Sequence, residues 1–114
     1  MRKLLIAVRS EMITDILEDH LKHEFEIHTC NRGDDALQLL EELRPEALII
    51  SLALSHVTGL SVLQQSTYKP PAVLALTGFI SDAIIEEATS AGAGDLLLFP
   101  CASEYIVYRF KQLL

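Results

Sequence analysis

The chain has 114 residues, half of them apolar and 22% charged, which is enough for one domain with a packed core and too few for two. Its net charge of −7 argues against direct nucleic-acid binding by this domain, because contacts with phosphates need clustered Lys and Arg side chains. The apolar runs are too short for a membrane span or a signal peptide. The two cysteines lie far apart in the sequence and indicate neither a disulfide framework nor a zinc site. We therefore expect a protein of the reducing cytoplasm.

The first part of the chain predicts two pairs of a strand followed by a helix. Residues 3–8 are a continuous apolar run, which indicates a strand covered on both faces. Residues 10–22 carry apolar side chains at helical spacing behind Ser10, a residue type that caps helix N-termini. Residues 25–30 alternate between apolar and polar side chains, as a half-exposed edge strand does. Residues 33–44 form an amphipathic helix with acids in its first turn, where they complement the helix dipole.

The middle of the chain predicts two buried strands separated by a short helix. Residues 47–52 read "ALIISL", an apolar strand in which Ser51 is the one polar side chain. Residues 59–65 predict the short helix, and a Pro-Pro pair ends the loop before the apolar strand at residues 72–77. Ser51 therefore stands at the carboxyl end of a buried strand, where α/β proteins place their chemistry.

The last part of the chain predicts a helix, a strand and a final helix. Ser81 is the expected cap and Gly92 the expected stop of a helix over residues 81–92. Residues 95–99 are the fifth strand, and residues 103–114 the fifth helix.

This strict alternation predicts an α/β fold with a parallel sheet and helices on both faces. With the second strand at an edge and strands one, three and four buried, the expected strand order is 2-1-3-4-5. The prediction is a flavodoxin-like three-layer α/β/α sandwich with five strands and five helices, as one domain over residues 1–114.

Over essentially its whole length the chain resembles the receiver domains of bacterial two-component response regulators, the CheY-like proteins. The resemblance rests on the fivefold alternation and on "RPEALIISLALSHVTGL" (44–60), "AVLALTG" (72–78) and "AGAGDLLLFP" (91–100). It implies a role in signal transduction, and it implies dimerisation through the fourth and fifth helices. In the family, an aspartate after the third strand accepts a phosphoryl group, two acids after the first strand hold magnesium, and a hydroxyl and a lysine contact the phosphoryl oxygens.

At the matching positions this sequence departs from that pattern. The acid pair falls on Val8 and Arg9, the phosphoacceptor on Ser51 and the lysine on Phe99, whereas the hydroxyl is kept as Thr77. The resemblance therefore implies a degenerate pseudo-receiver that lacks the phosphoacceptor aspartate. In the family, an aromatic side chain changes its rotamer on phosphorylation, and this position falls on Leu96 here. Gly59 and Pro100 follow the family.

These departures predict that the crevice has no phosphoryl-transfer activity. Magnesium needs oxygen ligands, but Val8 offers none and Arg9 places a positive charge where the ion would sit. A serine nucleophile needs an adjacent base, and none follows a neighbouring strand. We expect no enzymatic activity and no cofactor or metal, with Phe99 filling the crevice. We expect Ser51 to cap local backbone or to hydrogen-bond Arg9 or Thr77.

A second interpretation gives the crevice a ligand. Arg9, Ser51 and Thr77, close to the N-terminus of the first helix, would hold an anion such as a phosphate ester, which would make the domain a small-anion or metabolite sensor. The alternative is that Arg9 points to solvent or pairs with Glu11.

The last two helices carry the clearest sign of a protein contact. Tyr105 and Tyr108 lie off the core stripe of the final helix, and the consecutive Ile84 and Ile85 cannot both point into the core. We interpret these four residues as an interface for a homodimer, a partner protein or an output domain. The alternative is that the tyrosine rings lie flat over their own core. The core stripe itself consists of Ile106, Phe110 and Leu113.

Three smaller expectations complete the prediction. His20 and His23 lie three residues apart on the first helix, but no third metal ligand is evident, so we expect a solvated helix face. Cys30 and Cys101 have no basic neighbours in the sequence and are expected to be unreactive thiols. The resemblance implies a cis peptide bond between Phe99 and Pro100.

The expected function is a phosphorylation-independent regulatory module, such as the N-terminal part of a transcriptional response regulator.

Overall fold

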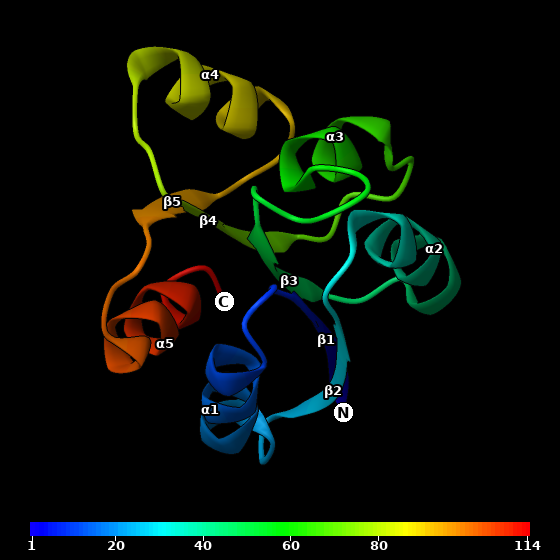
Figure 1. The fold of residues 1–114 in the computed structure, drawn as a ribbon. Helices are drawn as coiled ribbons and strands as arrows, with labels where there is room; N and C mark the ends of the chain where they lie inside the picture. The colour runs from blue at the N-terminus through cyan, green and yellow to red at the C-terminus, as the bar shows by residue number, and fades with distance from the viewer.

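In the computed structural model, which describes residues 1–114, five strands and five helices alternate along the chain and form three layers (Figure 1). The strands are β1 (Arg2–Ala7), β2 (Phe25–Cys30), β3 (Ala47–Ser51), β4 (Ala72–Thr77) and β5 (Asp95–Leu98). The helices are α1 (Glu11–Leu21), α2 (Gly33–Leu43), α3 (Gly59–Gln65), α4 (Asp82–Ser90) and α5 (Ser103–Lys111). Every predicted element is confirmed, and the helix and strand ends differ from the prediction by at most three residues.

All strand pairs are parallel, and the order in the sheet is β2-β1-β3-β4-β5, which confirms the predicted topology. β2 and β5 are therefore the edges. The register places Ser51 at the end of β3 opposite Leu76, and Thr77 at the end of β4 opposite Leu98. Because the strands are parallel, the loops that follow them gather at one edge of the sheet.

Two apolar cores form, one on each face of the sheet, because successive side chains of a strand point to opposite faces. The first core lies under α1 and α5, and the second lies under α2, α3 and α4 (Figure 1). On β1, Leu4 and Ile6 enter the first core while Leu5 and Ala7 enter the second, so this strand is buried on both sides. No helix is long and apolar enough to cross a lipid bilayer.

The predicted N-caps of α1 and α4 are confirmed. The Ser10 hydroxyl accepts a hydrogen bond from Ile13 N at 3.3 Å, and the Ser81 hydroxyl accepts one from Ile84 N at 3.2 Å. After α4 the chain turns at Gly92, whose φ is +112°, a conformation that side chains with a Cβ rarely adopt. The peptide bond between Phe99 and Pro100 is cis, as the family resemblance implies.

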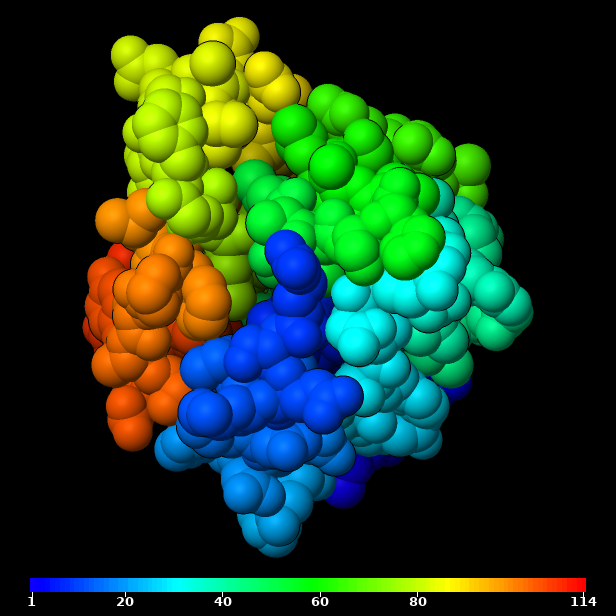
Figure 2. All heavy atoms as spheres, viewed as in Figure 1, coloured from blue at the N-terminus to red at the C-terminus, as the bar shows by residue number.

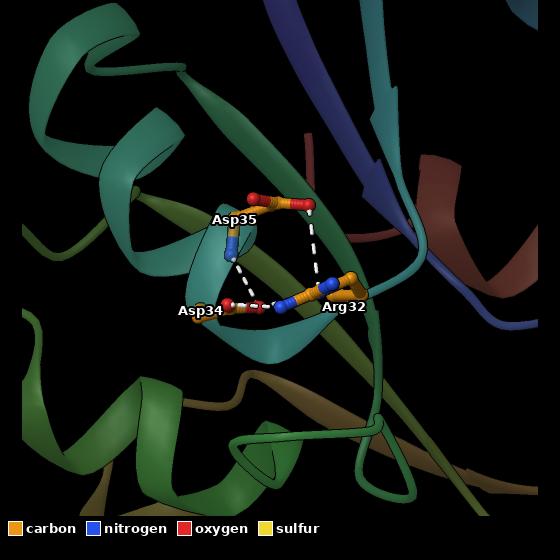
Figure 3. Close-up of polar contacts among 3 residues, drawn as sticks. All are labelled: Arg32, Asp34 and Asp35. Atoms are coloured by element: carbon orange, nitrogen blue, oxygen red, sulfur yellow. Dashed lines mark hydrogen bonds and ion pairs between the residues drawn. The ribbon is translucent and has the colours of Figure 1, made fainter.

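The turn into α2 is organised by Arg32 (Figure 3). Its guanidinium forms two hydrogen bonds to the Asp34 carboxylate, at 3.0 and 2.7 Å, and lies 4.0 Å from Asp35. The hydrogen bond from Arg32 lowers the pKa of Asp34 to about 2. The negative charge thus stays at the helix N-terminus, where the helix dipole favours it.

The same turn packs directly on the loop that follows β3. Gly33 N donates to Ser55 O at 2.9 Å, and a Cβ on Gly33 would lie only 1.7 Å from Val57 O. The start of this loop is also in close contact with α3. A Cβ on Gly59, the first residue of that helix, would lie 2.0 Å from the carbonyl oxygen of Ser51, where the loop begins. The β3–α3 loop is therefore held from two sides by backbone contacts that only glycine permits.

We predict that Gly33→Ala destabilises the fold by about 1–3 kcal/mol, although alanine is the better helix former, because the added methyl group must push the β3–α3 loop away. Urea unfolding followed by circular dichroism measures this change. Gly78→Ala is the matched control, since a Cβ there meets nothing closer than 3.8 Å, and it should change stability by less than about 0.5 kcal/mol. Equal effects of the two substitutions would contradict the packing argument.

Candidate functional site

A crevice lies at the carboxyl ends of β1, β3 and β4, with a volume of about 440 Å³. The structure brings together all five positions that the sequence marked for this site. The lining residues are Val8, Arg9, Ser10, Ser51, Ala53, Leu76, Thr77, Gly78 and Phe99. None of these residues carries a carboxylate, so the one formal charge on the lining is the positive charge of Arg9.

Ser51 uses its hydroxyl to hold the backbone of its own loop. The oxygen accepts a hydrogen bond from Ala53 N at 3.2 Å, which confirms the expected local cap. The alternative contacts to Arg9 and Thr77 are not formed. Ser51 also has no histidine or carboxylate beside it to take its proton, so the hydroxyl is a structural group in this geometry.

Thr77 is buried, and its hydroxyl is likewise bound to its own loop. It donates to Phe79 O at 2.9 Å and accepts from Phe79 N at 3.4 Å. The turn into the β4–α4 loop is therefore fixed by one side chain. Neither of the two hydroxyls predicted to bind an anion is left without a protein partner.

Arg9 is exposed and forms no ion pair or hydrogen bond, so it points to solvent, as one predicted alternative has it, and the other alternative, a pairing with Glu11, is not formed. The other four arginines all have a partner. Arg32 and Arg109 bind carboxylates, and Arg2 and Arg44 lie over the rings of Phe25 and Tyr68. Arg9 is thus the one arginine without an ion-pair, hydrogen-bond or aromatic partner.

Phe99 does not fill the crevice, and the prediction that it does is wrong. Its half-buried ring packs against the core under α1 and α5 and forms one wall of the hollow. This core lies on one face of the sheet, whereas the crevice opens at the ends of the strands. The space between the strand ends therefore stays accessible, with an apolar wall where the family has a lysine.

A second hollow of about 380 Å³ lies next to the crevice, between the β3–α3 and β4–α4 loops. It shares Ala53, Thr77 and Gly78 with the crevice. The remaining lining residues are Leu52, Thr58, Leu60, Phe79 and Ile84. Sequence reasoning missed this hollow, although the apolar pair Phe79-Ile80 in a loop directly after a strand was a signal that could have indicated it.

A third hollow, beside α1 and β2, is lined by acidic side chains. Glu11, Asp15 and Glu18 follow one another along this face of the helix. No group of three or more His, Cys, Asp or Glu side chains converges as the ligands of a metal ion would. His20 on α1 and His23 in the turn after it are both exposed, so the prediction that His23 lies on the first helix is wrong.

The predicted interface residues lie on the two helices that flank the edge strand β5 (Figure 1). Ile85, Tyr105 and Tyr108 are exposed, and Leu98 of β5 lies between the two helices with 54% of its surface accessible. Ile84 differs from the other three predicted residues, because it is half-buried and lines the second hollow.

Tyr105 also has a role within its own chain. Its hydroxyl accepts a hydrogen bond from Arg109 at 2.5 Å, and Arg109 makes two further bonds of 2.7 Å to the Asp95 carboxylate on β5. This network attaches α5 to the edge strand. Tyr108 makes no such contact, so it is the more available of the two tyrosines.

Burial raises the pKa of the Cys30 thiol to about 11, and the nearby negative charge of Asp35 adds to this effect. Burial also raises the pKa of Cys101. Both thiols are therefore protonated at neutral pH, and a protonated thiol is a poor nucleophile. This environment supports the expectation that neither cysteine is reactive.

We predict that Cys30 in a Cys101→Ser variant reacts with iodoacetamide at pH 8 about 100-fold more slowly in the folded chain than in urea, because only the thiolate attacks the reagent. The rate should rise as the pH is raised toward 11, since the thiol then loses its proton. Mass spectrometry of quenched samples measures both rates. Similar rates for folded and unfolded protein would show that the Cys30 thiol is not protected.

Comparison with known proteins assigns this architecture to a family. The family model of the response regulator receiver domain matches residues 6–111. The chain is similar to the chemotaxis protein CheY4 of Vibrio cholerae, with a TM-score of 0.85, 25% identity and coverage of 100% of this chain and 99% of that one.

Two further solved structures are similar. A LuxR-family DNA-binding response regulator from Staphylococcus aureus has a TM-score of 0.81 and 25% identity, with 99% of this chain and 98% of that one covered. A response regulator from Burkholderia pseudomallei, whose structure holds a phosphorylated aspartic acid, a calcium ion and citrate, has a TM-score of 0.75 and 25% identity, with 94% of this chain and 65% of that one covered.

Proposed function

This chain belongs to the response regulator receiver domain family, and we propose that it is a phosphorylation-independent member that signals through protein–protein contacts. The observation that carries the proposal is the absence of any carboxylate from the lining of its crevice. An acyl phosphate forms on a carboxylate, as on the phosphorylated aspartic acid of the Burkholderia pseudomallei regulator. Ser51 occupies the end of β3 here, and its hydroxyl has no base beside it.

The residues of the crevice also do not fit a magnesium ion. Magnesium is held by oxygen ligands, usually one or two carboxylates and several waters. Val8 contributes only hydrocarbon, and the Arg9 guanidinium would repel a dication at the same place. The acids of α1 line another hollow, beside β2, which has only Val8 in common with the crevice. We therefore propose that the domain is not an enzyme and needs no metal.

We predict that acetyl phosphate or beryllofluoride with magnesium changes neither the mass of the protein nor its amide NMR spectrum. Intact-mass spectrometry and ¹H–¹⁵N correlation spectra measure the two effects. Ser51→Asp alone should remain unmodified, because Val8 still offers no oxygen ligand for magnesium and the charge of Arg9 still repels the ion. Magnesium-dependent phosphorylation of the wild-type chain would overturn the proposed function.

The surface around β5 supports a protein-interaction role. Ile85, Leu98 and Tyr108 expose apolar area on the two helices and the edge strand between them. Aromatic and aliphatic side chains of this kind form the centres of protein interfaces, and in a twofold dimer the same patch is used twice. We propose a constitutive homodimer through α4 and α5, with an output domain or another protein as the alternative partner. The similarity to a LuxR-family regulator favours a place in transcription regulation.

We predict that Ile85→Glu combined with Tyr108→Glu raises the dissociation constant of the dimer at least about tenfold, because two charges per subunit would have to be buried. Tyr105 is left unchanged, since its hydroxyl binds Arg109 within the chain. Sedimentation velocity with and without magnesium measures the association.

Met12→Glu on α1 is the control for this experiment, because Met12 is exposed and belongs to none of the three elements of the proposed interface, α4, β5 and α5. It should leave association unchanged. A wild-type chain that sediments as a monomer at high micromolar concentration would exclude the homodimer and leave a different protein as the partner of this surface.

A second candidate function is that of a small-anion or metabolite sensor. The observation that favours it is the unpaired charge of Arg9 at the rim of an accessible crevice. Ser51 and Thr77 contribute less to such a site than the sequence predicts, because both hydroxyls already bind their own loops.

A further inference from the structure

The crevice and the hollow beside it form one groove whose two ends differ in chemistry. They share Ala53, Thr77 and Gly78, so the two hollows adjoin at these residues. The two parts measure about 440 and 380 Å³, each of the size of sites that hold small organic molecules. Figure 2 shows the surface hollowed where the β1–α1 segment (blue), the β3–α3 loop (green), the β4–α4 loop (yellow-green) and the β5–α5 segment (orange) meet.

One end of the groove is positively charged. Arg9 lines it and has no partner, whereas the chain as a whole carries a net charge of −7. A guanidinium binds carboxylates and phosphates through paired hydrogen bonds. Val8, Leu76 and Phe99 line the same part of the groove, so the charged group stands beside hydrocarbon.

The other end of the groove offers no free polar side chain. Leu52, Leu60, Phe79 and Ile84 supply apolar surface, and no lining residue is charged. The two threonine hydroxyls there are already used, since Thr77 binds the backbone of Phe79 and Thr58 binds Ser61. This end can therefore bind hydrocarbon and has little to offer a polar group.

We propose that the groove binds a small amphipathic carboxylate, whose charged group pairs with Arg9 and whose hydrocarbon body lies across Thr77 and Gly78 toward Phe79. An inorganic anion would use only the Arg9 end, and a neutral apolar molecule only the other end. The inference deepens the sensor function and rests on it, because it defines the ligand class of the same crevice. Phe79, with 67% of its surface exposed, would lose much of that exposure when the hydrocarbon is bound.

Sodium butanoate, hexanoate and octanoate test the proposal. 1-Octanol is the probe that lacks the charge, and acetate is the carboxylate that lacks a hydrocarbon chain. Isothermal titration calorimetry and ¹H–¹⁵N spectra follow binding to the wild-type chain. We expect saturable binding that strengthens at least about twofold for each added methylene, less than the roughly fourfold of full burial because the groove is open. Shifts should concentrate at Ser51, Leu60, Thr77, Gly78 and Phe79. Acetate and 1-octanol should bind at least about tenfold more weakly than octanoate.

Two pairs of variants separate the ends of the groove. Arg9→Gln should weaken octanoate binding at least about fivefold, while Arg2→Gln, which makes the same change in charge at the opposite end of β1, should change it less than about twofold. Phe79→Ser should remove most of the gain from hexanoate to octanoate, whereas Met12→Ser on α1 should keep it.

Absence of saturable octanoate binding, equal loss in the two arginine variants, or shifts confined to α4 and α5 would overturn this inference. Such results leave the phosphorylation-independent role intact, because that role is tested by mass change with acetyl phosphate and magnesium. Conversely, magnesium-dependent phosphorylation would overturn the proposed function even if octanoate binds.

Discussion

Helices cover the central sheet on both faces, so the side chains in the middle of β1, β3 and β4 are apolar whichever way they point. This burial supplies most of the hydrophobic stabilisation, and it leaves the ends of the strands as the places where polar side chains of the sheet can reach solvent. Ser51 and Thr77 are the last residues of β3 and β4, and Arg9 follows the end of β1. The parallel arrangement places these three ends side by side, so the crevice is a consequence of the way the core is built.

The two loops that border the crevice are held in different ways. The β3–α3 loop is packed against the backbone on both sides, at Gly33 and at Gly59, and it is also joined to the turn before α2 by a bridge between Arg32 and Ser55. The β4–α4 loop is held at its start by the bonds between Thr77 and Phe79, and its two apolar side chains Phe79 and Ile80 remain exposed. One wall of the groove is therefore rigid, and the other offers apolar surface to a partner or ligand.

The electrostatics of the crevice are opposite to those that a metal-dependent phosphoryl transfer requires. Carboxylates would attract a dication and accept the phosphoryl group, whereas here a single guanidinium stands at the rim and hydrocarbon lines the walls. The chain has 16 Asp and Glu against 9 Lys and Arg, and acidic side chains gather elsewhere, for example along the α1 face that borders β2. The fold of the family is retained. The proposed ligand in the groove follows from the residues that line the crevice, and the proposed protein contact follows from the exposed apolar side chains around β5.

The sequence by itself determined the elements, their order in the sheet and the positions that meet at the crevice. Apolar periodicity, the serine caps and the alternation of strands with helices are local signals, and parallel strand order converts them into neighbours at one edge. Ser51 is marked by its place at the carboxyl end of a buried strand, whereas Val8, Arg9, Thr77 and Phe99 are marked by the resemblance to receiver domains, and all five line the crevice.

Only the tertiary structure decided which way those side chains point and what they contact. Phe99 packs into a core on one face of the sheet, Ser51 and Thr77 bind their own loops, and Arg109 attaches α5 to β5. The second hollow arises where two loops from different strands approach each other, so no single stretch of sequence describes it. Side-chain direction and cavity shape depend on packing between residues far apart in the chain, and periodicity along the chain carries no information about that packing.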